Sequence, residues 1–250
     1  MTKIILHGCM GKLGCAIVSY ASGEITAGID EKGGSAGFPV YKSLGECPES
    51  ADVIVDASVV DALPGLLEYG LKHKIPLVIC TTGFSDEQMK KIKETSESIA
   101  VLWSANMSLG VNLLINMVKK VSGMLYESGF DIEIIEKHHN LKLDAPSGTA
   151  KVLANAAKES VGQGTKFVYD RSKDLKKRER NEIGVHALRG GAIVGEHSVI
   201  YAGAGEVIEL KHQALSKEVF AAGVLRAAQF LKGKPAGFYN MNDVLGEIFK

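Results

Sequence analysis

Short apolar runs alternate with amphipathic stretches in the first part of the chain. The apolar runs have few polar interruptions, which is typical of strands buried on both faces of a sheet. The stretches between them place apolar residues at helical spacing. We predict strands over residues 3–7, 25–30, 52–56, 77–80 and 100–103, and helices over residues 11–21, 61–72 and 86–96. This alternation predicts an α/β fold with a doubly wound parallel sheet that helices cover on both faces.

The pattern changes after residue 107. Residues 110–126 form one long apolar stripe at helical spacing, and residues 131–137 alternate isoleucine with charged residues, as expected for a strand with one wet face. We predict further helices over residues 147–161 and 217–231, and strands over residues 185–188, 192–201 and 206–212. The pattern predicts a second, α+β domain with a mixed or antiparallel sheet and helices on one side. The charged run at residues 171–180 has no apolar period and predicts a solvated loop.

These two patterns predict three parts: residues 1–107, residues 108–216, and a C-terminal part over residues 217–250. Residues 243–249 and the helix before them are expected to pack back on the first part. The chain has 250 residues, which is enough for one large domain or two modest ones.

The composition is that of an ordinary globular protein, with 46% hydrophobic and 23% charged residues and a formal net charge of zero. This balance gives no reason to expect a nucleic-acid or membrane partner, and no apolar run reaches the ~18 residues of a membrane helix. Residues 1–9 are too short, and too soon interrupted by Gly8, for a signal peptide. The four cysteines form no Cys-x-x-Cys pair and no zinc-finger spacing, which favours reduced thiols in the cytoplasm.

A glycine turn follows the first predicted strand and precedes a helix. Gly8, Gly11 and Gly14 lie three residues apart, with Met10 where the commoner dinucleotide fingerprint has its second glycine. Backbone N–H groups in such a turn, at a helix N-terminus, bind a pyrophosphate. The turn predicts a Rossmann-like sheet; the alternative is a tight turn that binds no nucleotide. The candidate cofactor residues here are Gly8, Cys9, Met10, Gly11, Lys12 and Leu13.

Two further strand ends offer cofactor contacts. Asp30 ends the second strand, about 20 residues past the turn, where a carboxylate binds ribose hydroxyls. An acid there repels a 2′-phosphate and favours NADH, whereas Lys32 opposes that repulsion; Asp30 is alternatively a simple turn residue. Thr81 and Thr82 follow another strand and could bind a nicotinamide carboxamide, or belong to the N-cap of the next helix.

A polar segment at residues 138–149 has the chemistry of a carboxylate-binding site. His138 and His139 point to opposite sides if both lie in a strand, so one can donate a proton while the other binds a carboxylate. The ammonium of Lys142 attracts an anion, and residues 147–149 begin a helix with hydroxyl and N–H donors. The segment predicts a small dicarboxylate as substrate.

Plainer interpretations of this segment remain open. A His-His pair can bind a metal, although no acidic or cysteine ligand is suitably placed beside it, so we expect no metal site. Ser147 can be an N-cap only, and either histidine can be purely structural.

In these residues and several other segments, the chain resembles the dihydrodipicolinate reductase family of the diaminopimelate route to lysine, over essentially its whole length. The most specific feature is the string His-His-x-x-Lys-x-Asp-Ala-Pro-Ser-Gly-Thr at residues 138–149. The other matching segments are residues 8–14, 81–84, 105–106, 110–112, 189–191, 194–197, 220–231 and 243–245, together with Glu136.

The resemblance implies a role for each part of the chain. It makes His138 the general acid or base and Lys142 a carboxylate ligand that can also donate a proton. It makes residues 1–107 a dinucleotide-binding domain and residues 108–216 a substrate-binding and oligomerisation domain of a homotetramer. The substrate-binding residues it implies are His139, Ser147, Gly148 and Thr149. The cofactor-binding residues it adds are Cys80, Thr81, Thr82, Ser104, Ala105, Asn106 and Met107.

The implied reaction is loss of water from a 4-hydroxy substrate and reduction of the ring by NADH or NADPH. The chain departs from the family pattern on the cofactor side, at Lys12, Glu31, Ala57, Cys80 and Met107. These departures leave open whether the cofactor is NADH or NADPH. Asp30 and Glu31 slightly favour NADH. The alternatives are another two-domain NAD(P)-dependent dehydrogenase and a non-catalytic NAD(P)-binding sensor.

Overall fold

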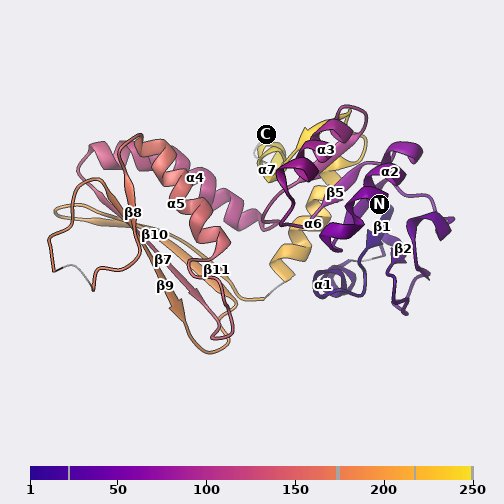
Figure 1. Cartoon of the computed structure of the whole chain (residues 1–250), viewed down its shortest axis with the longest axis horizontal. Coiled ribbons are helices and arrows are strands. Elements are labelled where there is room, and N and C mark those ends of the chain that lie inside the picture. Colours follow the sequence, from indigo (N-terminus) through magenta and orange to yellow (C-terminus); the bar gives the residue numbers. More distant parts are fainter. Residues whose placement is uncertain (22, 173–174, 217, 249–250) are drawn as a thin grey trace. The chain divides into compact units, whose positions relative to one another are not determined.

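The computed structural model describes residues 1–21, 23–172, 175–216 and 218–248 (Figure 1). Parts of three predicted segments lie outside these residues: positions 173–174 of the charged run, Lys217, and Phe249. The chain divides into two compact units. Unit 1 comprises Met1–Leu109 and Lys217–Lys250, and unit 2 comprises Gly110–Ser216. No helix among the described residues is long and apolar enough to cross a membrane.

Unit 1 is built on a parallel sheet with the strand order β12-β6-β5-β4-β1-β2-β3. All of its strand pairs are parallel, as the strand–helix alternation predicts. The strands are β1 (Ile4–His7), β2 (Ile25–Ile29), β3 (Val40–Tyr41), β4 (Val53–Asp56), β5 (Leu77–Ile79), β6 (Ala100–Trp103) and β12 (Gly237–Tyr239). The predicted doubly wound fold is thus confirmed.

Helices cover both faces of this sheet because side chains of a strand alternate between its faces. Ile4 and Leu6 of β1 pack into one apolar core, and Ile5 between them packs into the other. The first core includes α1 (Lys12–Tyr20), α6 (Glu218–Leu231) and α7 (Met241–Ile248), and the second includes α2 (Leu63–His73) and α3 (Asp86–Ser96). Two short 3-10 helices, η1 (Leu44–Glu46) and η2 (Val60–Ala62), connect these elements.

The start of α3 decides between the two interpretations of the preceding threonines. Ser85 is the N-cap: its hydroxyl accepts from the backbone N–H of Gln88, and the Gln88 side chain accepts from the N–H of Ser85. This reciprocal pair satisfies two N–H groups that the helix leaves unpaired. The N-cap alternative for Thr81 and Thr82 is therefore wrong.

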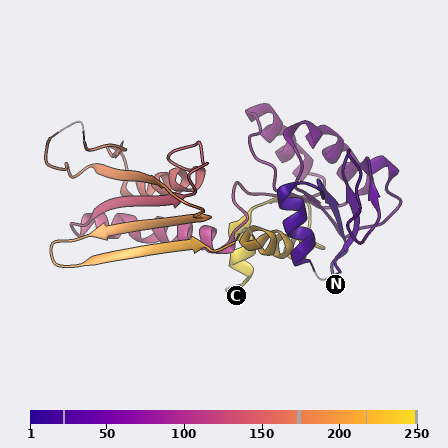
Figure 2. The same ribbon diagram turned by 90° about the horizontal axis from the view of Figure 1, so that it is seen from below.

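Unit 2 has a mixed sheet with the strand order β11-β10-β7-β9-β8. Strand β10 is antiparallel to β7 and β11, whereas β9 is parallel to β7 and β8. Figures 1 and 2 show α4 (Leu109–Glu127) and α5 (Gly148–Val161) on one face of this sheet. The strands are β7 (Asp131–His138), β8 (Lys166–Val168), β9 (Glu182–Arg189), β10 (Gly195–Ala202) and β11 (Val207–Ala214). The predicted mixed sheet with helices on one side is confirmed.

The structure corrects three details of unit 2. Strand β9 begins at Glu182, three residues before the strand predicted over residues 185–188. The strand predicted over residues 192–201 begins only at Gly195, because residues 190–194 form the turn that follows β9. The charged run is a loop, as predicted, but it is not simply solvated. Arg171 and Arg178 both donate to Glu133 of β7, at 2.9 and 3.0 Å, and Arg171 also binds Glu182 of β9 at 2.6 Å.

Candidate functional site

Three adjoining pockets follow the carboxyl ends of the strands of unit 1. The pocket beside β2, of about 300 Å³, contains Asp30, Glu31 and Lys32. It shares residues 57–59 with a second pocket of about 410 Å³, and the second shares Leu13 and Cys80 with a third of about 370 Å³. Together they form a groove across the ends of β2, β1, β4 and β5. Open α/β sheets bind ligands at this edge.

The glycine turn lines this groove, and its glycines allow close packing of the backbone. Gly8 has φ +78°, and a Cβ there would lie 2.7 Å from the carbonyl oxygen of Ala57. A Cβ at Gly14 would collide with the carbonyl oxygen of Gly8. Gly11 is the N-cap of α1 and has no side chain that could cover the first N–H groups of the helix. The backbone is thus open to a phosphate at a helix N-terminus.

Asp30 is fixed at one end of the groove. Its Oδ2 accepts from the backbone N–H of Met10 at 3.2 Å, and its Oδ1 accepts from the N–H of Lys32 at 3.2 Å. These bonds tie the carboxylate to the glycine turn. A carboxylate at the end of the second strand is the group that binds ribose hydroxyls in dinucleotide-binding sheets.

Thr81 and Thr82 have different surroundings. The Thr81 hydroxyl is buried and donates to Asp56 Oδ2 at 2.6 Å, whereas Thr82 is exposed in the second pocket. Asp56 also accepts from Ser58 Oγ at 2.5 Å, and His7 Nδ1 lies 2.9 Å from it. The Thr81 hydroxyl is therefore already engaged by the protein.

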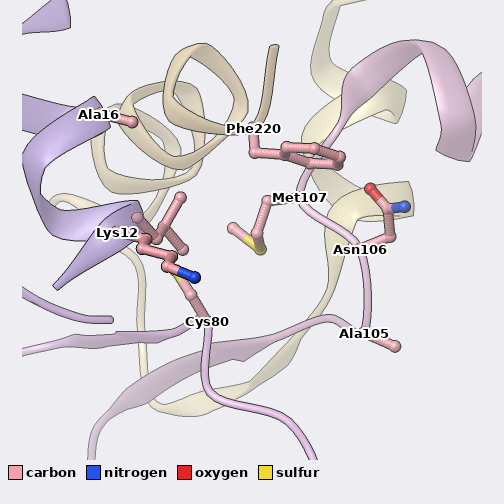
Figure 3. A pocket seen from close by; sticks show the side chains of 8 residues that line it. Lys12, Ala16, Cys80, Ala105, Asn106, Met107 and Phe220 are labelled. Carbon is pink, nitrogen blue, oxygen red and sulfur yellow. The ribbon is translucent and has the colours of Figure 1, made fainter. Parts of the chain in front are cut away.

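The third pocket brings together residues from four segments of unit 1 (Figure 3). Lys12 comes from α1, Cys80 follows β5, residues 105–107 follow β6, and Phe220 comes from α6. Burial raises the pKa of the Cys80 thiol, so the group stays protonated. Ser104 does not line this pocket; its hydroxyl donates to the carbonyl of Asn106 at 3.0 Å and shapes the loop.

A second cluster lies in unit 2, around the end of β7. His138 Nδ1 is 2.6 Å from Glu136 Oε2. Arg189, at the end of β9, donates to both oxygens of Glu136 at 2.7 Å. The Glu136 side chain is fully buried. Burial raises the pKa of Glu136, but the hydrogen bonds from Arg189, His138 and the Ser147 N–H outweigh it, and the net shift is downward.

Ser147 connects this cluster to α5. Its N–H donates to Glu136 Oε1 at 2.9 Å, and its hydroxyl accepts from the N–H of Ala150, so Ser147 is indeed the N-cap. The same hydroxyl lies 3.1 Å from His197 Nε2. Burial, reinforced by the charge of His138, lowers the pKa of His197 to about 4, so its ring is neutral near pH 7. The rings of His138 and His197 meet edge to face at 5.1 Å.

The remaining predicted residues surround this cluster. Lys142 Nζ contacts Asp144 Oδ1 at 2.7 Å, and its side chain is 22% exposed. His138 ends β7 and is buried, whereas His139 lies just past the strand and is half-buried. Gly148 is exposed and Thr149 half-buried in the first turn of α5. Among the described residues, no group of three or more His, Cys, Asp or Glu could hold a metal ion.

Among the residues of these sites that had no role in the sequence prediction are Glu136, Arg189, His197 and Phe220. Glu136 could have been found, because residues two apart in a strand share a face and Glu136 therefore accompanies His138. Arg189 and His197 come from other strands of the sheet, and no local pattern in the sequence places them beside His138.

The family models and the relatives in sequence agree on one family. The family model described as dihydrodipicolinate reductase, N-terminus, matches residues 2–107, and its C-terminus counterpart matches residues 110–245. The 4-hydroxy-tetrahydrodipicolinate reductase of Clostridium novyi (strain NT) is 53% identical over 250 residues, 98% of each chain. That of Caldanaerobacter subterraneus subsp. tengcongensis is 48% identical over 98% of each chain.

Solved structures show the same fold. A dipicolinate-bound dihydrodipicolinate reductase from Paenisporosarcina sp. TG-14 matches with a TM-score of 0.82 and 22% identity, over 97% of this chain and 99% of that one. Aspartate dehydrogenase from Thermotoga maritima matches with a TM-score of 0.52 and 16% identity, over 94% and 98%. With both halves matched by its models and relatives near 50% identity over almost the full length, the chain belongs to the dihydrodipicolinate reductase family.

Proposed function

We propose that this protein reduces 4-hydroxy-tetrahydrodipicolinate to tetrahydrodipicolinate, with loss of water, in the diaminopimelate route to lysine. The observation that carries the proposal is the coexistence of two built sites in one chain that matches reductases of this name. One is the groove at the carboxyl edge of the parallel sheet. The other is the buried cluster around His138, with Lys142 beside it.

The groove fits NADH or NADPH, which supplies the hydride for the ring. Residues 8–13 would hold the pyrophosphate through backbone N–H groups. Asp30 would accept from the ribose hydroxyls, because it lines the groove beside the glycine turn. The third pocket, with Cys80, Thr82 of the neighbouring pocket and residues 105–107, would hold the nicotinamide. Asp30 and Glu31 repel a 2′-phosphate, so we propose a preference for NADH.

The polar segment of unit 2 would bind and protonate the substrate. Lys142 would exchange its contact with Asp144 for a substrate carboxylate, and its ammonium can also supply a proton. Gly148 and Thr149, at the N-terminus of α5, would bind the second carboxylate together with His139. Ser147 would shape this carboxylate-binding site rather than donate its N–H to the substrate, since that N–H already donates to Glu136. His138 would transfer the proton to the ring.

The division of the chain into domains and its assembly into an oligomer form part of the same proposal. We assign cofactor binding to residues 1–107 with the return of residues 217–250, and substrate binding and assembly to residues 108–216. The sheet face opposite α4 and α5 exposes Leu188 and Val207, which supports a homotetramer formed through this face. Light scattering of the purified protein tests that state. We further propose a cytoplasmic location, supported by four cysteines that are all free thiols.

The central experiment is an assay with freshly generated 4-hydroxy-tetrahydrodipicolinate and each cofactor in turn. We expect loss of the reduced-nicotinamide absorbance with both cofactors and a higher kcat/KM with NADH. A parallel panel of amino-acid and semialdehyde substrates tests for another dehydrogenase activity. Binding of NADH without turnover of any dicarboxylate would instead identify a nucleotide sensor and overturn the proposal.

A further inference from the structure

Glu136 is the most deeply buried carboxylate of the cluster around His138. Its side chain has no exposed surface, and one oxygen faces His138 Nδ1 at 2.6 Å. A buried charge is costly unless it is paired and fully hydrogen-bonded. Here both oxygens are paired: Arg189 donates to each, and the Ser147 N–H donates to Oε1. A fully satisfied carboxylate thus faces one particular nitrogen of the imidazole.

We propose that Glu136, held by Arg189, is a positioning residue that fixes the proton of His138 on Nδ1 and leaves Nε2 as the nitrogen that transfers protons. The proposal rests on the proposed function, in which His138 protonates the substrate. It adds the residue that sets the orientation and the tautomer of that acid. A carboxylate facing Nδ1 selects this tautomer because it can only accept a hydrogen bond.

The opposite side of the ring agrees with this assignment. Gly195 of β10 lies there, and a Cβ at this position would come within 3.1 Å of His138 Nε2. The absence of a side chain keeps the space beside Nε2 open. His197, also from β10, meets the ring edge to face and is neutral near pH 7, so it adds no positive charge there.

The surrounding charges keep the Glu136 carboxylate ionised. Arg189 from β9 and the Ser147 N–H from the start of α5 both favour the ionised carboxylate. Lys142 and Asp144, from the segment between β7 and α5, form an ion pair of their own. When the Nε2–H bond breaks, its electron pair stays on nitrogen and the proton goes to the substrate. The hydrogen bond from Nδ1–H to Glu136 remains, and the imidazolium becomes a neutral imidazole.

The same strand provides a matched control. Glu133 of β7 is also held by two arginines, and its Oε2 lies 2.8 Å from His186 Nε2. Strand alternation places Glu133 on the face opposite Glu136. Glu133→Gln therefore removes a carboxylate in a similar network, on the same strand, that does not touch His138.

The test compares Glu136→Gln with Glu133→Gln by ¹⁵N NMR of histidine-labelled protein without substrate, with His138→Gln used to assign the signals. At a pH where the His138 ring is neutral, we expect its Nδ1–H tautomer in the wild type and in Glu133→Gln. In Glu136→Gln we expect a mixture of tautomers, because an amide can also donate to Nδ1. Glu136→Asp, which keeps the charge, should largely restore the Nδ1–H form. An unchanged tautomer in Glu136→Gln would overturn the proposal.

Kinetics give a second readout. In Glu136→Gln we expect kcat to fall by between about 10-fold and 10⁴-fold, where the upper value is the loss that a catalytic histidine in the wrong tautomer causes. KM should change by less than about 3-fold. A kcat unchanged from that of the wild type would contradict the proposal.

The two readouts separate failure of the network from failure of the proposed function. The NMR experiment needs no turnover, so it tests the role of Glu136 even if the protein does not reduce 4-hydroxy-tetrahydrodipicolinate. If Glu136→Gln does not fold, Arg189→Gln leaves the carboxylate in place with a weaker anchor. It should then show a broadened or mixed His138 tautomer, and an unaltered Nδ1–H form would count against the role of Arg189.

Discussion

The Thr81 hydroxyl donates a 2.6 Å hydrogen bond to Asp56 Oδ2 between the ends of neighbouring strands β4 and β5. Asp56 is almost fully buried, and Thr81 is one of the donors that make its charge tolerable there. The bond therefore connects the stability of the sheet to the shape of the groove above it.

Replacing Thr81 with valine tests this connection. Valine keeps the shape and removes the donor, so we expect a loss of about 1–3 kcal/mol in the free energy of unfolding. Thr82→Val, at the exposed neighbour, should change it by less than about 0.5 kcal/mol. Urea unfolding of both variants measures the difference, and equal stabilities would show that Asp56 does not need the hydroxyl.

Gly223 of α6 packs directly on the loop that lines the third pocket. A Cβ at Gly223 would collide with the carbonyl oxygen of Met107, whereas a Cβ at Gly65 of α2 meets nothing. We expect Gly223→Ala to destabilise unit 1 by about 1–3 kcal/mol through overpacking and to weaken NADH binding. Gly65→Ala should leave both unchanged or slightly raise stability. Thermal unfolding and NADH fluorescence titration provide the comparison.

His138→Ala removes the proposed proton donor. We expect kcat to fall by about 10²–10⁴-fold, the range for a lost general acid, while NADH binding in unit 1 is retained. Steady-state kinetics and a separate NADH titration measure the two effects. A kcat equal to that of the wild type would exclude His138 as the acid.

Lys142→Ala removes the proposed carboxylate ligand. A hydrogen bond to a charged group contributes about 1.5–3 kcal/mol, so KM for the substrate should rise about 10- to 100-fold. Lys137→Ala is the matched control, because Lys137 pairs with Glu196 and, by strand alternation, lies on the opposite face from His138. Equal KM values for the two variants would contradict the assignment of Lys142 as a ligand of the substrate carboxylate.

His197 makes the stability of the fold depend on pH. Its pKa is about 4 in the folded protein against an ordinary value of 6.5, so the unfolded chain binds a proton first as the pH falls. The contribution of His197 to the free energy of unfolding is therefore close to zero above about pH 6.5, becomes more destabilising as the pH falls, and is constant below about pH 4. We expect a cost on the order of 2 kcal/mol near pH 5. His197→Gln should lose less stability than the wild type between about pH 7.5 and 5, measured by urea unfolding.

The elements that the sequence predicts well are those whose own residues carry the signal. The long stripe in α4 and the apolar run of β4 are found within a residue or two. Strands β3, β8 and β12 escape prediction because they are two or three residues long and owe their existence to a partner strand.

The site divides in the same way. His138 and Lys142 stand out because their motif is contiguous. Arg178 looked like a solvated charge, since its partners Asp131 and Glu133 lie more than forty positions earlier in the chain. Phe220 reaches the third pocket only because α6 packs against β4, β5 and β6, a relation that no local periodicity reveals.

The position of β12 has a consequence for synthesis on the ribosome. This strand pairs with β6, and the helix before it covers one face of the sheet, yet both are made after residues 110–216. Those residues take about 5–20 s to translate at ~5–20 residues per second. During that interval the nascent parallel sheet lacks an edge strand and leaves apolar side chains of β4 and β5 uncovered.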